Sequence, residues 1–196
     1  MNKKGMRIIK KTLAMAILCL GFAACATTQL SQSDIAEKQA SLRDMANQAL
    51  TKLYSTNPAA KGAIMNAAGY AVFSDFGFKL IYAGGAKGKG IAVNNTTKQE
   101  TFMKMMELQP GLGLGAEKFW LIFVFETPAA FTSFVTSGWE AGANAMMAAK
   151  SKTAGGALAG AVTVSDGVYM YQITEKGLMV GISVTGAKYS RDKDLE

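Results

Sequence analysis

An unbroken apolar run over residues 119–125, followed by Glu126, constrains the fold more than any other part of the chain. Residues 119–126 read FWLIFVFE, and a run of seven aromatic, aliphatic or β-branched residues is typical of a strand covered on both faces. A buried helix is the alternative. However, Thr127 and Pro128 follow directly, and this pair suits the N-cap and first turn of a new helix. We therefore predict a strand that ends at Glu126 and a helix that begins at Pro128.

The predicted helix has one apolar face and a clear end. Phe131, Phe134 and Val135 are spaced three and four residues apart, and Gly138 follows as a natural C-terminal cap. Burial of each large apolar side chain contributes about 1.5–3 kcal/mol. We expect this strand and helix to dominate the hydrophobic core.

The remainder of the chain predicts one α+β domain over residues 33–196. Helical spacing of apolar residues extends over residues 34–54, and a short second helix follows over residues 59–67. Beyond Gly69 the pattern changes to strands punctuated by glycine, with Asp166 and Gly167 as a hairpin turn. The expected strands are residues 70–74, 78–83, 90–93, 101–108, 111–116, 157–164, 168–173 and 178–184. The predicted fold is thus N-terminal helices followed by a mostly antiparallel, glycine-rich β structure with one packed helix.

The first helix allows two roles, core packing and contact with a membrane surface. Three acidic and three basic residues balance between Asp34 and Tyr54. Helices that lie in a membrane surface usually carry an excess of Lys and Arg. The charge balance therefore favours core packing and leaves membrane contact as the alternative.

Residues 1–24 have the pattern of a secretory signal: a basic start, an apolar run over residues 12–24 and small residues at its end. The run is shorter than the roughly 20 residues that a membrane-spanning helix needs. The segment FAAC ending at Cys25 resembles a bacterial lipobox, which implies an acylated Cys25 as the first mature residue and a tether over residues 25–32. Phe22 stands where Leu is usual, so cleavage without acylation is the alternative. Ala26 resembles the pattern sent to the outer membrane, so we expect the protein in the cell envelope, facing the periplasm.

The formal charge of +7 gives a misleading picture of the mature domain. Five of the 21 basic residues lie within the first eleven positions, and removing them leaves 16 basic against 14 acidic residues. A domain near +2 gives no basis for a nucleic-acid interface. We therefore expect no nucleic-acid partner.

Few residues could support catalysis or bind a metal. The chain has no histidine, and its two cysteines are Cys19, within the signal, and Cys25. Glu126, Glu140 and Asp166 are the acidic residues nearest the expected core, but no spacing pairs them for acid–base chemistry. We expect no enzymatic activity, no metal and no cofactor.

The glycine-rich segment over residues 84–90, GGAKGKG, contains Lys87 and Lys89. A Walker loop needs four residues between its first Gly and its Gly-Lys, followed by Ser or Thr. This segment has three, followed by Gly90, so it fails the match. Two interpretations stay open: a glycine-rich hairpin, or a site where Lys87 and Lys89 donate to lipid phosphate. Lys150 and Lys152 are further candidates for headgroup binding.

Four stretches together resemble the SYLF-domain family, over roughly residue 58 to the C-terminus. In chain order they are AGYAVF at residues 68–73, GGAKGKG at 84–90, GWEAGAN at 138–144 and GLMVGISVTGAK at 177–188. Thr185 stands where the family usually has Glu, so any role of that carboxylate is absent. In the third stretch we expect Gly138, Trp139 and Gly142 to be structural, with Trp139 as a buried anchor.

The resemblance implies a lipid-binding module, and fungal family members also bind actin. We therefore expect a non-catalytic envelope lipoprotein that binds phospholipid headgroups and is held on the membrane by acylated Cys25. The alternative is a structural or partner-binding periplasmic lipoprotein with no lipid site. The sequence names no protein partner.

Overall fold

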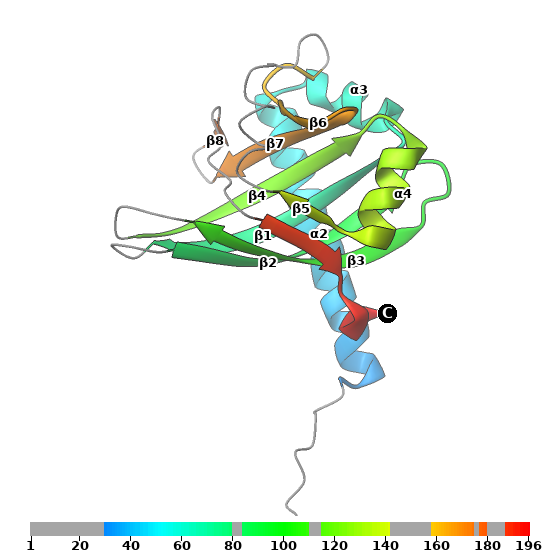
Figure 1. Ribbon diagram of the computed structural model, residues 1–196, viewed down its shortest axis with the longest axis vertical. Helices are drawn as coiled ribbons and strands as arrows, with labels where there is room; N and C mark the ends of the chain where they lie inside the picture. The colour runs from blue at the N-terminus through cyan, green and yellow to red at the C-terminus, as the bar shows by residue number, and fades with distance from the viewer. Residues whose placement is uncertain (1–29, 80–83, 110–114, 142–157, 175–176, 180–186) are drawn as a thin grey trace, which may run out of the picture. The chain divides into compact units, whose positions relative to one another are not determined.

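The computed structural model describes residues 30–79, 84–109, 115–141, 158–174, 177–179 and 187–196 (Figure 1). Candidate residues Cys25, Gly142, Lys150 and Lys152 lie outside these ranges. Residues Gln32–Glu196 form one compact unit. Every buried core residue of the described ranges lies between Leu42 and Leu195, so the unit contains its own core.

Two helices come first in the described part of the chain, as predicted. Helix α2 (Gln32–Thr56) buries residues at helical spacing along one side, and α3 (Ala59–Asn66) follows Pro58. The buried residues of α2 are Leu42, Ala46, Ala49, Leu50 and Leu53. This apolar stripe packs on the sheet, so core packing is the role that α2 has in this structure. No helix formed by the described residues combines the length and apolarity needed to cross a bilayer.

The strands form one curled sheet in which every pairing is antiparallel (Figure 1). They are β1 (Gly69–Lys79), β2 (Gly84–Asn94), β3 (Glu100–Gln109), β4 (Gly115–Phe125), β5 (Trp139–Ala141), β6 (Val162–Ser165), β7 (Val168–Thr174), β8 (Gly177–Met179) and β9 (Ala187–Arg191). Their spatial order is β5-β9-β3-β2-β1-β4-β7-β6, and β8 pairs with β7. The predicted α+β class is confirmed.

Strand β4 and helix α4 (Pro128–Ser137) confirm the predicted central unit. The hydroxyl of Thr127 accepts a hydrogen bond from the backbone N–H of Ala130 at 3.2 Å, and Gly138 ends the helix with a φ of 73°. Phe131, Phe134 and Val135 are buried. Local capping chemistry therefore fixes both ends of α4.

The sheet is covered on both faces where β1 and β4 cross its centre, because α4 lies on one face and α2 on the other (Figure 1). Side chains alternate along a strand. Phe73 and Phe123 point to the α4 side, where their rings meet at 6.0 Å, and Val72 and Ile122 point to the other side. All four are buried. The prediction of a strand covered on both faces is confirmed.

Several predicted boundaries were wrong. Residues 69–79 form one strand, where we expected a break, because β1 pairs with β2 and β4 along its whole length. In the predicted strand 157–164, residues 158–160 instead form a turn, with Gly160 at a φ of 84°. Strands β5 and β9 were not predicted. They are short, and β9 buries only alternate residues. The segments 110–114 and 180–186, where we expected strand, lie outside the described residues.

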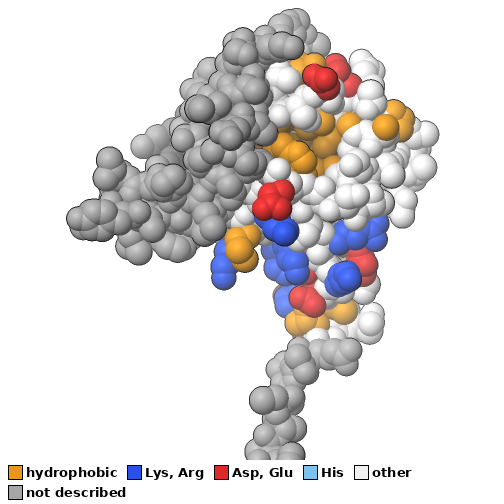
Figure 2. Space-filling view, in the orientation of Figure 1, with side chains coloured by type: hydrophobic (Ala, Val, Ile, Leu, Met, Phe, Trp, Pro, Cys, Tyr) orange, Lys and Arg blue, Asp and Glu red, His pale blue; other side chains and the backbone are white. Residues whose placement is uncertain are grey.

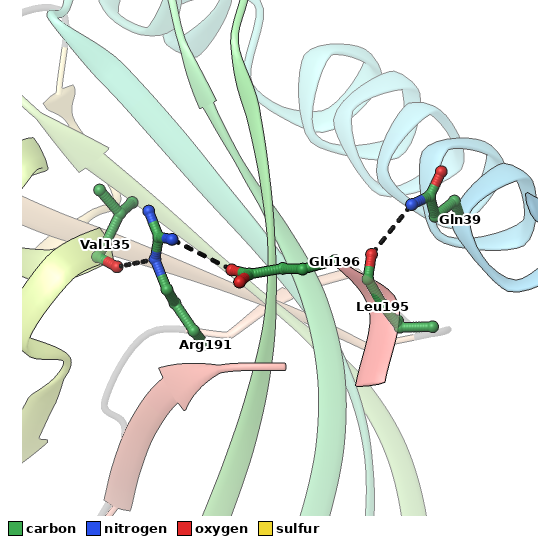
Figure 3. Close-up of polar contacts among 5 residues, drawn as sticks. All are labelled: Gln39, Val135, Arg191, Leu195 and Glu196. Atoms are coloured by element: carbon green, nitrogen blue, oxygen red, sulfur yellow. Dashed lines mark hydrogen bonds and ion pairs between the residues drawn. The ribbon is translucent and has the colours of Figure 1, made fainter. Parts of the chain in front are cut away.

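The C-terminal segment forms hydrogen bonds with helices α2 and α4 (Figure 3). Arg191 donates from Nε to the carbonyl oxygen of Val135 in α4 at 2.8 Å, and its Nη1 lies 3.1 Å from Oε1 of Glu196. Gln39 in α2 donates from Nε2 to the carbonyl oxygen of Leu195 at 2.9 Å. The segment after β9, including the short helix η2 (Lys193–Leu195), is thereby held between α2 and α4.

Candidate functional site

The register of the strands arranges the α2 face of the sheet into rows of side chains. In a directly opposed antiparallel pair, both side chains point to the same face. The innermost row is buried and consists of Phe102, Ile91, Val72, Ile122 and Tyr171. Arg43 of α2 lies over the Phe102 ring at 5.4 Å and binds Glu100 at 2.7 Å. Helix α2 therefore covers the innermost row, which is the first row of this face.

The next two rows carry lysines, which emerge into solvent on β2, β3 and β9. The second row contains Lys104, Lys89, Ser74 and Trp120, and the third contains Lys188, Met106 and Lys87. Lys87, Lys89, Lys104, Lys188 and Met106 are all exposed. We call these five residues the lysine face.

Lys89 and Lys104 lie directly opposite each other on β2 and β3. Like charges in such a pair are destabilising. The amino group of Lys89 lies 2.6 Å from Oδ2 of Asp192, a residue with an almost completely buried side chain. Asp192 thus compensates one of the two charges and reduces the repulsion.

The four lysines of this face meet only two carboxylates among the described residues. Asp192 binds Lys89, and Glu140 of β5 lies 3.8 Å from Lys188, with both of the latter side chains exposed. Lys87 and Lys104 have no acidic partner in the described part of the chain. Figure 2 views the molecule from the α4 side, opposite the lysine face, and shows Lys and Arg side chains with a few acidic ones among them in its lower half. The lysine face therefore has two uncompensated positive charges.

A groove of about 650 Å³ separates α2 from the second row. Its sheet wall contains Ser74, Lys89 and Trp120, and its helix wall contains Glu37 and Asp44 among polar and apolar neighbours. Because the charge of Lys89 is already compensated, the groove is not itself a cationic site. The positive charge lies on the open strands beyond it.

The structure brings together two of the predicted lipid-binding residues, Lys87 and Lys89, and gives them different partners. The glycine-rich segment around them is the first part of β2. At Gly90 a Cβ atom would lie 2.4 Å from the Phe73 ring, so the close approach of Phe73 requires this glycine. Lys87 and Lys89 therefore lie on the paired strand β2.

Sequence reasoning missed Lys104, Met106 and Lys188 as members of this site. Alternation along residues 101–106 could have indicated the first two, because buried Met103 and Met105 alternate with them. Lys188 comes from β9, which the sequence did not predict. Only the pairing of β3 with β9 places it beside Met106.

The expected structural residues lie on the opposite face. Gly138 has a positive φ, and a Cβ there would lie 2.4 Å from the carbonyl oxygen of Tyr189. Trp139 is partly buried and packs its ring against Phe123 at 6.0 Å and against Tyr189 at 5.7 Å. Trp139 therefore covers one side of the aromatic core and stays partly exposed, so it is less buried than we expected.

The fold and this surface define an α+β domain with an open cationic sheet face. Residues 106–196 match a family model, Ysc84, which is described as Las17-binding protein actin regulator. The chain is also 36% identical over 159 residues to Beta cell expansion factor A of Aeromonas veronii, an alignment that covers 81% of this chain and 59% of that protein. The family-model match over residues 106–196 confirms the resemblance to the SYLF family, and the chain spans about three fifths of that relative's length.

Proposed function

We propose that this chain is a non-catalytic lipid-binding module whose lysine face binds the phosphate of anionic phospholipid headgroups. The observation that supports it is the exposure of Lys87 and Lys104, without acidic partners among the described residues, on strands that α2 leaves uncovered. A lysine amino group is a compact charge that suits phosphate. The paired strands hold the two lysines at fixed positions.

Two lysines recognise a headgroup but do not anchor a protein. Each basic side chain near an anionic surface contributes about 1 kcal/mol. Acyl chains contribute about 0.8 kcal/mol for each buried CH₂ group, so two or more chains give stable attachment. We assign anchoring to acylated Cys25 and headgroup recognition to the lysine face, which places the protein in the cell envelope, at an outer membrane facing the periplasm.

Partner binding without a lipid site is the second candidate function. It is favoured by the family description, Las17-binding protein actin regulator, which names a protein partner. An acidic protein surface would meet the same uncompensated charges of Lys87 and Lys104. Vesicle binding distinguishes the two functions, because only the first requires lipid.

The experiment uses the unit Gln32–Glu196, which contains its own core and excludes Cys25. We expect it to bind vesicles with phosphatidylglycerol, to ignore vesicles of phosphatidylcholine alone, and to bind less as salt rises. Replacing Lys87 and Lys104 together with Ala should weaken binding about 30-fold, the equivalent of about 2 kcal/mol.

The matched control replaces Lys38 and Lys61 with Ala, which removes the same charge from exposed positions on α2 and α3. Its vesicle binding should stay close to that of the wild type. If the wild-type unit ignores both kinds of vesicle, the lipid-binding function is wrong and partner binding takes its place. If both double variants lose binding equally, the site is not the lysine face.

A further inference from the structure

Met106 is an exposed apolar residue at the centre of the lysine face. Its side chain is 53% exposed, and the one other large apolar side chain with high exposure among the described residues is Met65 on α3. Met106 lies directly opposite Lys87 on β2 and Lys188 on β9. Lys104 precedes it by two residues on the same face of β3. Three lysines therefore surround one unpartnered methionine.

A single apolar residue on a polar surface is ordinary and needs no explanation. Met106 differs, because three lysines surround it. Directly opposed side chains have Cβ atoms about 4.5–5.5 Å apart. The four-carbon stems of Lys87 and Lys188 can therefore extend alongside Met106 while their amino groups stay in a polar layer. The group presents an apolar tip with cations around its base.

We propose that strands β2, β3 and β9 lie against a lipid bilayer, with Met106 inserted below the phosphates and Lys87 and Lys104 at the phosphate level. This inference rests on the proposed function and adds to it the docking surface, its orientation and an inserted side chain. Two uncompensated charges complement an anionic leaflet. The flexible thioether side chain fits between acyl chains without a complementary pocket.

The neighbouring contacts keep this surface open. Arg43 is held by Glu100 and by the Phe102 ring, so α2 stops at the first row. Lys89 is held by Asp192 and contributes no net charge. An acidic protein would need a specific cavity for Met106, whereas a bilayer accepts it at any point.

A single fluorescent label tests the docking surface. Both cysteines of the chain lie within its first 25 residues, so Met106→Cys in the unit Gln32–Glu196 gives one attachment site for an environment-sensitive dye. On phosphatidylglycerol vesicles we expect a blue shift and quenching by nitroxides on the acyl chains. The matched control, Met65→Cys, should show neither.

Two further variants and one soluble polyanion complete the test. Met106→Asp should weaken vesicle binding about tenfold, and Met106→Leu should keep it, because an apolar side chain is what enters the lipid. If the unit binds vesicles while the label at position 106 stays unquenched, this inference is wrong and the proposed function stands. If the wild-type unit binds no vesicles at all, this inference and the proposed function are both wrong. An equal blue shift with soluble polyglutamate would assign the face to acidic proteins.

Discussion

The amino group of Lys89 binds the carboxylate of Asp192 across 103 positions of sequence, at 2.6 Å. The Lys89 side chain is 50% exposed, and the Asp192 side chain is 1% exposed. The backbone N–H of Asp192 also donates to the carbonyl oxygen of Phe102 at 2.9 Å. This pair therefore fixes the C-terminal segment against β2 and β3.

Replacing Lys89 with Met should destabilise the fold by about 1–3 kcal/mol, because it leaves a buried carboxylate without its charged partner. Urea denaturation measures this change. Lys87→Met is the matched control on the same strand and face, and it should change stability by less than about 0.5 kcal/mol. Adding Asp192→Asn to Lys89→Met should recover part of the loss. Equal stability of the two lysine variants would contradict this role of the pair.

Gly138→Ala should destabilise the protein by more than about 2 kcal/mol. The positive φ strains any other residue, and the new Cβ would collide with the backbone carbonyl of Tyr189. Gly62→Ala is the control, because Gly62 lies within α3 and a Cβ there meets no atom within 4 Å. That change should stabilise by about 0.5–1 kcal/mol. Thermal melting of the two variants should shift in opposite directions.

Trp139→Ala should cost about 3 kcal/mol, at the low end for a large aromatic residue, because Trp139 is only partly buried. The loss uncovers the rings of Phe123 and Tyr189. Trp139→Phe keeps an aromatic ring at this position and should recover about half of the loss. A melting temperature unchanged by Trp139→Ala would show that this ring does not cover the core.

Tyr171 should limit stability at alkaline pH. Burial raises its pKa from 10.0 to about 12, and its hydroxyl has no hydrogen-bond partner among the described residues. The unfolded chain loses this proton near pH 10 and the folded chain only near pH 12, so stability falls by on the order of 2 kcal/mol as pH rises through this window.

Tyr171→Phe should remove that part of the alkaline loss and raise stability at neutral pH by about 1 kcal/mol, because the buried hydroxyl has no partner. Denaturation in urea at pH 7 and pH 11 measures both effects. Tyr169→Phe is the comparison. Burial and the neighbouring Glu126 also raise the pKa of Tyr169, so this change should reduce the alkaline loss too. It should not raise stability at neutral pH, because the Tyr169 hydroxyl donates to Oε2 of Glu126 at 3.4 Å. If Tyr171→Phe destabilises at neutral pH, the hydroxyl has a partner after all.

Cys25→Ser should release the full chain from the membrane fraction and abolish labelling by a fatty-acid probe, because acylation requires the thiol. Cys19→Ser is the control within the same segment and should change neither result. Unchanged membrane retention of Cys25→Ser would contradict anchoring by this residue.

The sequence by itself determined the centre of the fold. The apolar run of β4, the Thr127 cap and the terminal Gly138 are local signals, because each specifies a backbone conformation through its own side chain or through the lack of one. Lys87 and Lys89 could be selected from the sequence as candidate lipid-binding residues, because they lie close together in a glycine-rich stretch. Continuous pairing of β1 could not be predicted from its interrupted pattern, because the partners on both sides decide it.

Only the tertiary structure decided which charges act together. Lys87, Lys104 and Lys188 come from three strands, and the register of those strands places them around Met106. The same register puts Lys89 beside Lys104, and the folded C-terminal segment brings Asp192 to compensate one of the two charges. Pairing between distant strands depends on the packing of the whole core, and no local pattern contains it. Local signals thus determined the conformation of single segments, and strand register determined which lysines face solvent without an acidic partner among the described residues.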